Sequence, residues 1–161
     1  MADTEPLDVY LNDHLAGSAA AVELVDRVRA SNEGTPLATH LEGLGQRIAE
    51  DRDTLTAVME HLGVVRSAPK QLAGKVLETL SRLRLNERVT GSAHVTRLME
   101  VETLSLGIEG KLALWRSLAQ VTGSRPELAG FDLAALETRA VDQRAGLEPF
   151  RLEAARQSFA P

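Results

Sequence analysis

Apolar residues recur at alternating steps of three and four through most of the chain, and this spacing constrains the fold more than any other feature. The clearest run follows Pro36 and is interrupted at one step only, by Asp51. Its apolar positions are Leu37, Leu41, Leu44, Ile48, Leu55, Val58 and Leu62. Such steps place side chains on one face of an α-helix, whereas a strand needs strict alternation. The spacing therefore predicts a long helix with one apolar face.

Clusters of glycine, proline and small polar residues divide this pattern into four long segments. The segments predict main helices over residues 6–30, 36–62, 92–122 and 132–158. Thr35, Ser92 and Asp132 stand where a helix needs an N-terminal cap. We expect the third helix to be the most buried, because it is apolar around most of its circumference. We expect Pro149 to kink or restart the fourth, because proline removes a hydrogen bond to the preceding turn.

The connection between the second and third main helices is too long for a tight turn. It has helical spacing of its own and predicts a crossover helix over about residues 70–88. It is also rich in basic residues, which are Arg66, Lys70, Lys75, Arg82, Arg84 and Arg88. This basic surface could dock an acidic partner or a phosphate, or it could be a solvated face whose long side chains cover apolar surface.

Composition favours a single all-α domain over residues 1–161. Aromatic residues make up only 3% of the chain, which favours helix packing over a sheet. The chain has no cysteine, which excludes disulfides and thiolate metal sites. The acidic N-terminus lacks a secretory signal, and no apolar stretch approaches the roughly 18–20 residues that span a bilayer, so we expect a cytoplasmic protein with no membrane partner. The net charge of -5 argues against a nucleic-acid partner.

Each main helix carries polar residues near its midpoint. In an antiparallel bundle these midpoints lie at similar heights, so the residues could form one layer. The candidates are His14, Ser18, Asp51, Glu102, Glu109 and Gln143. Bundles build metal and ligand sites from inward carboxylates and histidines on facing helices. The same groups could instead hydrogen-bond one another and fix the register, with the glutamates reaching solvent.

Two segments resemble the ferritin-like superfamily. Leu11-Asn12-Asp13-His14-Leu15-Ala16-Gly17-Ser18-Ala19 is similar to its LNxxLxxEL opening, and Leu106-Gly107-Ile108-Glu109-Gly110-Lys111-Leu112 is similar to its third helix. The long connection also fits the crossover of that superfamily. The resemblance implies an up-down four-helix bundle with a long helical crossover between the second and third main helices.

The same resemblance implies that the di-iron site of the superfamily is not retained. Ser18 stands where the first helix of di-iron members supplies a glutamate, and only Glu109 matches as a carboxylate. The second and fourth helices lack the Glu-x-x-His pair that puts two ligands on one face. Their nearest substitutes are Glu50-Asp51-Arg52-Asp53 and Asp142-Gln143-Arg144-Ala145. Ferroxidase, oxygenase and mineral-storage functions therefore do not follow from the resemblance.

These features favour a non-catalytic binding or structural module that needs no cofactor and forms a homo-oligomer, with a dimer as the expected state. The alternative is a metal-binding protein or metal-dependent enzyme that holds iron or manganese with ligands drawn from His14, Asp51, Glu102 and Glu109. A third possibility is a small-molecule pocket between helices beside His14, with the polar layer as its floor. No phosphate-binding loop or nucleophile turn can be drawn, so no catalytic residue is predicted.

Overall fold

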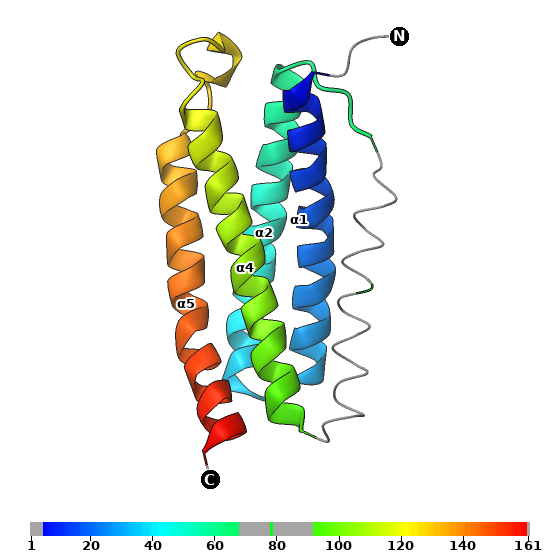
Figure 1. Cartoon of the computed structure of the whole chain (residues 1–161), viewed down its shortest axis with the longest axis vertical. Coiled ribbons are helices and arrows are strands. Elements are labelled where there is room, and N and C mark those ends of the chain that lie inside the picture. Colours follow the sequence, from blue (N-terminus) through cyan, green and yellow to red (C-terminus); the bar gives the residue numbers. More distant parts are fainter. Residues whose placement is uncertain (1–4, 68–77, 79–91, 161) are drawn as a thin grey trace.

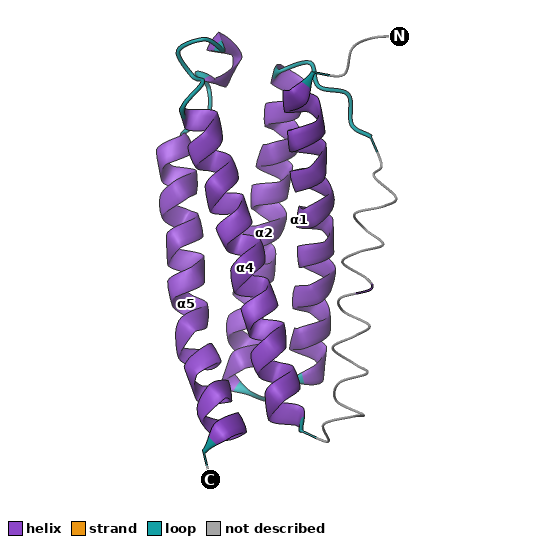
Figure 2. Cartoon of the chain, viewed as in Figure 1, coloured by secondary structure: helices purple, strands orange, loops and turns teal. Residues whose placement is uncertain are grey.

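The computed structural model describes residues 5–67, 78 and 92–160. Over these residues the chain forms four long helices and one short 3₁₀ helix, without a strand (Figures 1 and 2). The elements are α1 (Pro6–Ser31), α2 (Pro36–His61), α4 (Ala93–Ala119), η1 (Pro126–Leu128) and α5 (Leu133–Phe159). The all-α prediction is confirmed. The crossover helix predicted over 70–88 lies outside the described residues, apart from Glu78.

The long helices form a bundle of two antiparallel hairpins (Figure 1). α1 and α2 make the first hairpin, and α4 and α5 make the second. α2 ends and α4 begins at opposite ends of the bundle. The two hairpins meet chiefly where α1 packs against α4. No described helix combines the length and apolar character that crossing a membrane requires.

Local chemistry explains where the helices begin and end. Thr35, Ser92 and Asp132 each accept a hydrogen bond from the backbone N–H three residues further on, as predicted. Gly34 supplies the positive φ needed in the turn between α1 and α2. Pro149 does not restart the last helix, because α5 runs without interruption from Leu133 to Phe159. Pro149 lies on the exposed side of α5, where water can take the hydrogen bond that proline leaves unmade.

The core consists of two apolar clusters that meet near the middle of the bundle. The cluster nearer the α1–α2 turn includes Leu41 and Leu104, and the cluster nearer the other end includes Leu11 and Trp115. α4 contributes more buried side chains than any other described helix, as its apolar circumference predicts. Leu106 on the same helix nevertheless remains 72% exposed.

Ion pairs between α4 and α5 follow one another at intervals of seven residues, and we call them the α4–α5 ladder. Its pairs are Glu102–Arg151, Glu109–Arg144 and Arg116–Glu137. Each step of seven runs up one helix and down the other, which is the geometry of paired charges flanking an antiparallel seam. All three pairs of the ladder thus belong to one register of α4 against α5.

Candidate functional site

A buried polar network lies where the two apolar clusters meet. Its members are Asp51 of α2, Lys111 of α4 and Gln143 of α5. The Lys111 ammonium donates to Asp51 Oδ2 and to Gln143 Oε1, while Gln143 Nε2 donates to Asp51 Oδ2 at 3.0 Å. Arg139 Nη1 lies 3.2 Å from Asp51 Oδ1 at the outer edge. The buried carboxylate is therefore balanced by two cations, as a charge removed from water requires.

Lys111 is the central member of this network, and the sequence analysis did not select it. Because α4 is apolar around most of its circumference, its inward stripe does not stand out. The available signal is spacing, since Lys111 lies three residues after Ile108 and four before Trp115, and both of these are buried. Those steps place all three side chains on one face of the helix.

Burial lowers the pKa of Lys111 below its usual 10.5, because desolvation disfavours the ammonium form. Asp51 opposes this effect by attracting the charge, whereas Arg139 and Arg47 add to the lowering. Lys111 is also one of only three lysines in the chain, against 15 arginines. The bundle centre therefore carries an amine, which can change its charge, and not a guanidinium, which stays charged.

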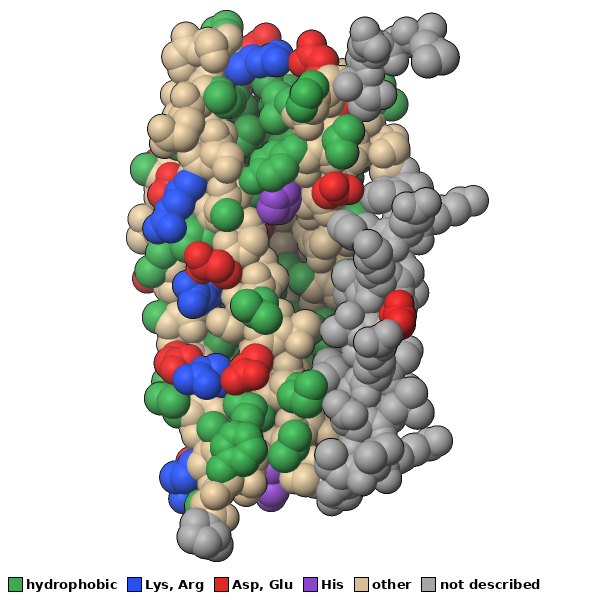
Figure 3. All heavy atoms as spheres, viewed as in Figure 1, with side chains coloured by type: hydrophobic (Ala, Val, Ile, Leu, Met, Phe, Trp, Pro, Cys, Tyr) green, Lys and Arg blue, Asp and Glu red, His purple; other side chains and the backbone are tan. Residues whose placement is uncertain are grey.

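A cavity of about 440 Å³ opens beside the network, between α1, α2 and α4. Small side chains on α1 and glycines on α4 leave this space. A Cβ built at Gly17, Gly107 or Gly110 would meet no atom within 4 Å. Figure 3 shows the hollow on this face of the molecule, beside a histidine side chain.

The cavity has mostly apolar walls, with polar groups at a few points. Its larger apolar side chains are Ile48, Leu55, Ile108, Leu114 and Trp115. The Trp115 ring is 1% exposed, and its Nε1–H has no hydrogen-bond partner among the described residues. A buried donor without an acceptor costs about 1–3 kcal/mol.

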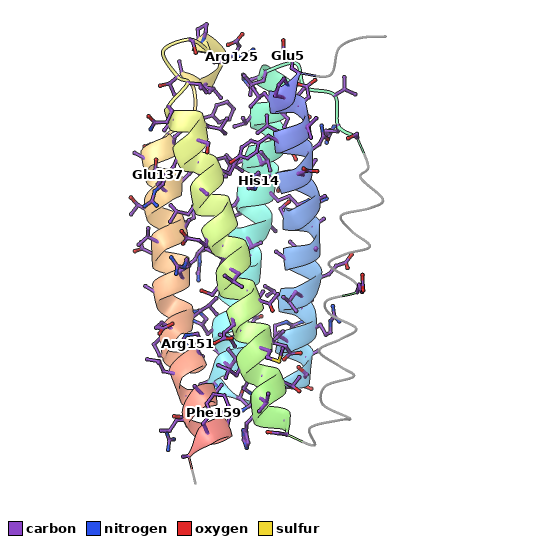
Figure 4. The ribbon with its side chains drawn as sticks, in the orientation of Figure 1. Glu5, His14, Arg125, Glu137, Arg151 and Phe159 are labelled. Carbon is purple, nitrogen blue, oxygen red and sulfur yellow. The ribbon has the colours of Figure 1, made fainter. Side chains whose placement is uncertain are left out.

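His14 of α1 lines the cavity, and its side chain extends toward α4 (Figure 4). Its ring meets the Tyr10 ring edge-on, with 4.6 Å between the centroids. Burial lowers the pKa of His14 below 6.5, and the charge of Asp13 opposes this shift. The imidazole is therefore neutral at pH 7 and offers one donor and one acceptor.

The charges that line the cavity cancel. Asp13 and Asp51 contribute two negative charges, while Arg52 and Lys111 contribute two positive charges. With His14 neutral, the lining has no excess of either sign. An uncharged ligand therefore suits this cavity better than an ion does.

The structure places four of the six candidate polar residues at the cavity or the network. His14, Ser18 and Asp51 line the cavity together, and Asp51 also bonds to Gln143. Ser18 Oγ already donates to the backbone oxygen of Leu15 at 2.6 Å, so its hydroxyl can offer a ligand only its acceptor lone pairs.

The other two candidates, Glu102 and Glu109, lie in the α4–α5 ladder, and each side chain is 45% exposed. They do not join His14 and Asp51, with which they formed the candidate ligand set. Within 5–67, 78 and 92–160, no three His, Asp or Glu side chains come together in a way that could hold a metal ion.

Models of protein families, curated proteins and solved structures gave no match to this chain. The cavity and the polar network beside it are therefore the features that bear on function.

Proposed function

We propose that this chain is a binding module that takes a neutral, mainly apolar small molecule with one hydrogen-bond acceptor into the cavity between α1, α2 and α4. The observation that carries the proposal is a mostly apolar cavity of about 440 Å³ with a few polar groups in its lining, among them the Lys111 ammonium. Ligand pockets commonly measure about 300–1,000 Å³, and in bundles they lie between helices. Apolar walls supply affinity, and a few polar groups fix the orientation.

A donor on α4 defines the acceptor. The Lys111 ammonium carries three protons, of which described residues accept two. A carbonyl oxygen fits the remaining proton and the balanced charge of the lining.

In this proposal the module holds no di-iron site, and the likeness of its first and third segments to the ferritin-like superfamily stays a hypothesis. The pairing of Glu109 with Arg144 supports the loss, because Glu109 is the one carboxylate that matches the superfamily. Elemental analysis of protein purified without chelators checks this. Stoichiometric iron or manganese would contradict it.

Titration of the full chain with prodan, a neutral aryl ketone dye, tests ligand binding directly. Trp115 is the only tryptophan of the chain and it lines the cavity. Energy transfer from Trp115 to the bound dye lowers the tryptophan emission, so this decrease reports that the cavity is occupied. We expect saturable binding.

A matched pair of variants locates the binding. In Gly110→Leu the new side chain grows into open space and fills the cavity. In Gly43→Leu the same residue enters α2 away from the cavity, where a Cβ meets only the Arg47 guanidinium at 3.3 Å. We expect the first variant to fold and lose the dye and the second to keep it. Equal dye binding by the two variants, or no binding by the unaltered chain, would overturn the proposal.

A further inference from the structure

We propose that Lys111 is a nucleophile that forms a reversible imine with an apolar aldehyde bound in the cavity. The inference rests on the proposed function, because the aldehyde has to enter the same cavity. It adds a covalent step and narrows the ligand from any acceptor-bearing molecule to a reactive carbonyl compound.

The position of the amine is the first support. Lys111 is the only lysine in the part of the chain that the structure describes, and it lines the cavity with a side chain that is 15% exposed. Two of its three protons go to Asp51 Oδ2 and Gln143 Oε1. These two contacts hold the nitrogen in place beside the open space, where a bound carbonyl carbon can reach it.

The surroundings of the amine are the second support. An ammonium group is not a nucleophile, so one proton has to leave before attack. Burial lowers the pKa of Lys111, and the adjoining Asp51 carboxylate can accept the proton. Lysine amines in desolvated pockets are the groups that proteins use for imine formation.

The step balances without any further reagent. Asp51 takes one proton from the ammonium, and the nitrogen lone pair forms a bond to the carbonyl carbon. The carbonyl oxygen takes a second proton from that nitrogen and becomes a hydroxyl. Asp51 then returns its proton to the hydroxyl, the carbon–oxygen bond breaks as the nitrogen lone pair forms the C=N bond, and the oxygen leaves as water. The sum is ammonium plus aldehyde giving protonated imine plus water. The positive charge stays on the nitrogen, so its ion pair with Asp51 is kept.

Trp115 lines the same cavity one helical turn beyond Lys111 on the same face of α4, so it belongs to the apolar wall that holds the aldehyde beside the amine. The rival explanation is that the network serves only to fix the register of three helices, in which case Lys111 does not react.

Reductive trapping of the full chain tests the inference. The protein is incubated at neutral pH with benzaldehyde and sodium cyanoborohydride, which reduces an imine to a stable benzylamine. Mass spectrometry after cleavage at arginine then locates the label. We expect Lys111 to be labelled at least about tenfold faster than Lys70 and Lys75, because the cavity holds the carbonyl beside the amine.

Variants separate the outcomes. The double variant Lys70→Arg/Lys75→Arg leaves Lys111 as the only lysine and should keep the fast label. Gly110→Leu, or Gly17→Leu as a second filling variant, should abolish the fast label without altering Lys111. Prodan binding with no label at Lys111, or labelling that survives filling of the cavity, would overturn the imine and leave the proposed function standing. Absence of prodan binding would instead overturn the proposed function.

Discussion

Asp51 and Lys111 lose most of their water when α2 and α4 pack, and their contacts with each other and with Gln143 offset that loss. Removing one partner of a buried pair costs about 3–5 kcal/mol, because the other charge is left uncompensated. Replacing both partners by apolar residues is often neutral. The pair therefore contributes more to the choice of register than to net stability.

The energetic coupling of the pair can be measured with a double-mutant cycle. We expect Asp51→Leu alone to lower the free energy of unfolding by about 3 kcal/mol, and Lys111→Met alone to have a similar effect. The double variant should recover most of the loss, since no buried charge remains unpaired. Urea denaturation of the four proteins gives the coupling energy. Effects that add to within about 0.5 kcal/mol would show that the two groups act independently.

His14 should make the stability of the protein pH-dependent. Its pKa is lowered by burial in the folded state, so below pH 6.5 the unfolded state binds more protons than the folded one. The free energy of unfolding therefore rises with pH between the folded pKa and 6.5, and it falls as the solution is acidified. The variant His14→Gln should lose this contribution.

Urea titrations of both proteins at several values between about pH 5 and 7 check this prediction. His40, whose pKa burial also lowers, is present in both proteins, so the difference between them isolates His14. Parallel pH profiles would contradict the assignment.

At the scale of elements, the helices and their ends are predictable from the sequence, whereas their contacts are not. Caps such as Thr35 and Asp132 act within one turn, and the apolar spacing of each helix is local as well. The partner of Glu109 depends on a residue on another helix, and nothing within α4 specifies it. Lys111 lies between these cases, because its spacing from Trp115 is local but its burial depends on α2 and α5.

The glycines of the helices should differ in their response to alanine. Gly110→Ala should raise the free energy of unfolding by about 0.5–1 kcal/mol, because alanine favours the helix and its Cβ meets nothing within 4 Å. Gly45→Ala should lower it, because the new Cβ would lie 3.0 Å from Cγ1 of the buried Val25. Chemical denaturation compares them. Stabilisation by both substitutions would show that α1 and α2 pack less closely at Gly45 than the 3.0 Å separation from Val25 implies.

The α4–α5 ladder should respond to charge reversal. Glu109→Arg places two arginines opposite each other and should lower the melting temperature, while adding Arg144→Glu restores an attractive pair in the opposite sense. The pair is half-exposed, so the effect should be about 1 kcal/mol or less and should shrink as salt is added. Thermal unfolding at low and high salt checks this. If the double variant is no more stable than Glu109→Arg alone, residues 109 and 144 do not lie opposite each other on α4 and α5.

At the scale of the whole molecule, the expected dimer stays a prediction. Exposed apolar side chains such as Leu106 on α4 and Leu152 on α5 give the described surface places where a second copy could pack. Sedimentation equilibrium should return twice the mass of the chain. A monomeric mass across the concentration range would remove this expectation.

The seam between the hairpins has a consequence for the order of folding. α1 and α2 are joined by a short turn, and α4 and α5 by residues 120–132, which include η1. Both connections are much shorter than the one between the hairpins, so each hairpin has less loop entropy to overcome and can form early. The seam of α1 against α4 joins residues on either side of the long connection and has to close afterwards. The cavity exists only once that seam is closed. A bound ligand therefore shifts the equilibrium from separated to docked hairpins. The two hairpins should separate less often in the ligand-bound protein than in the ligand-free protein.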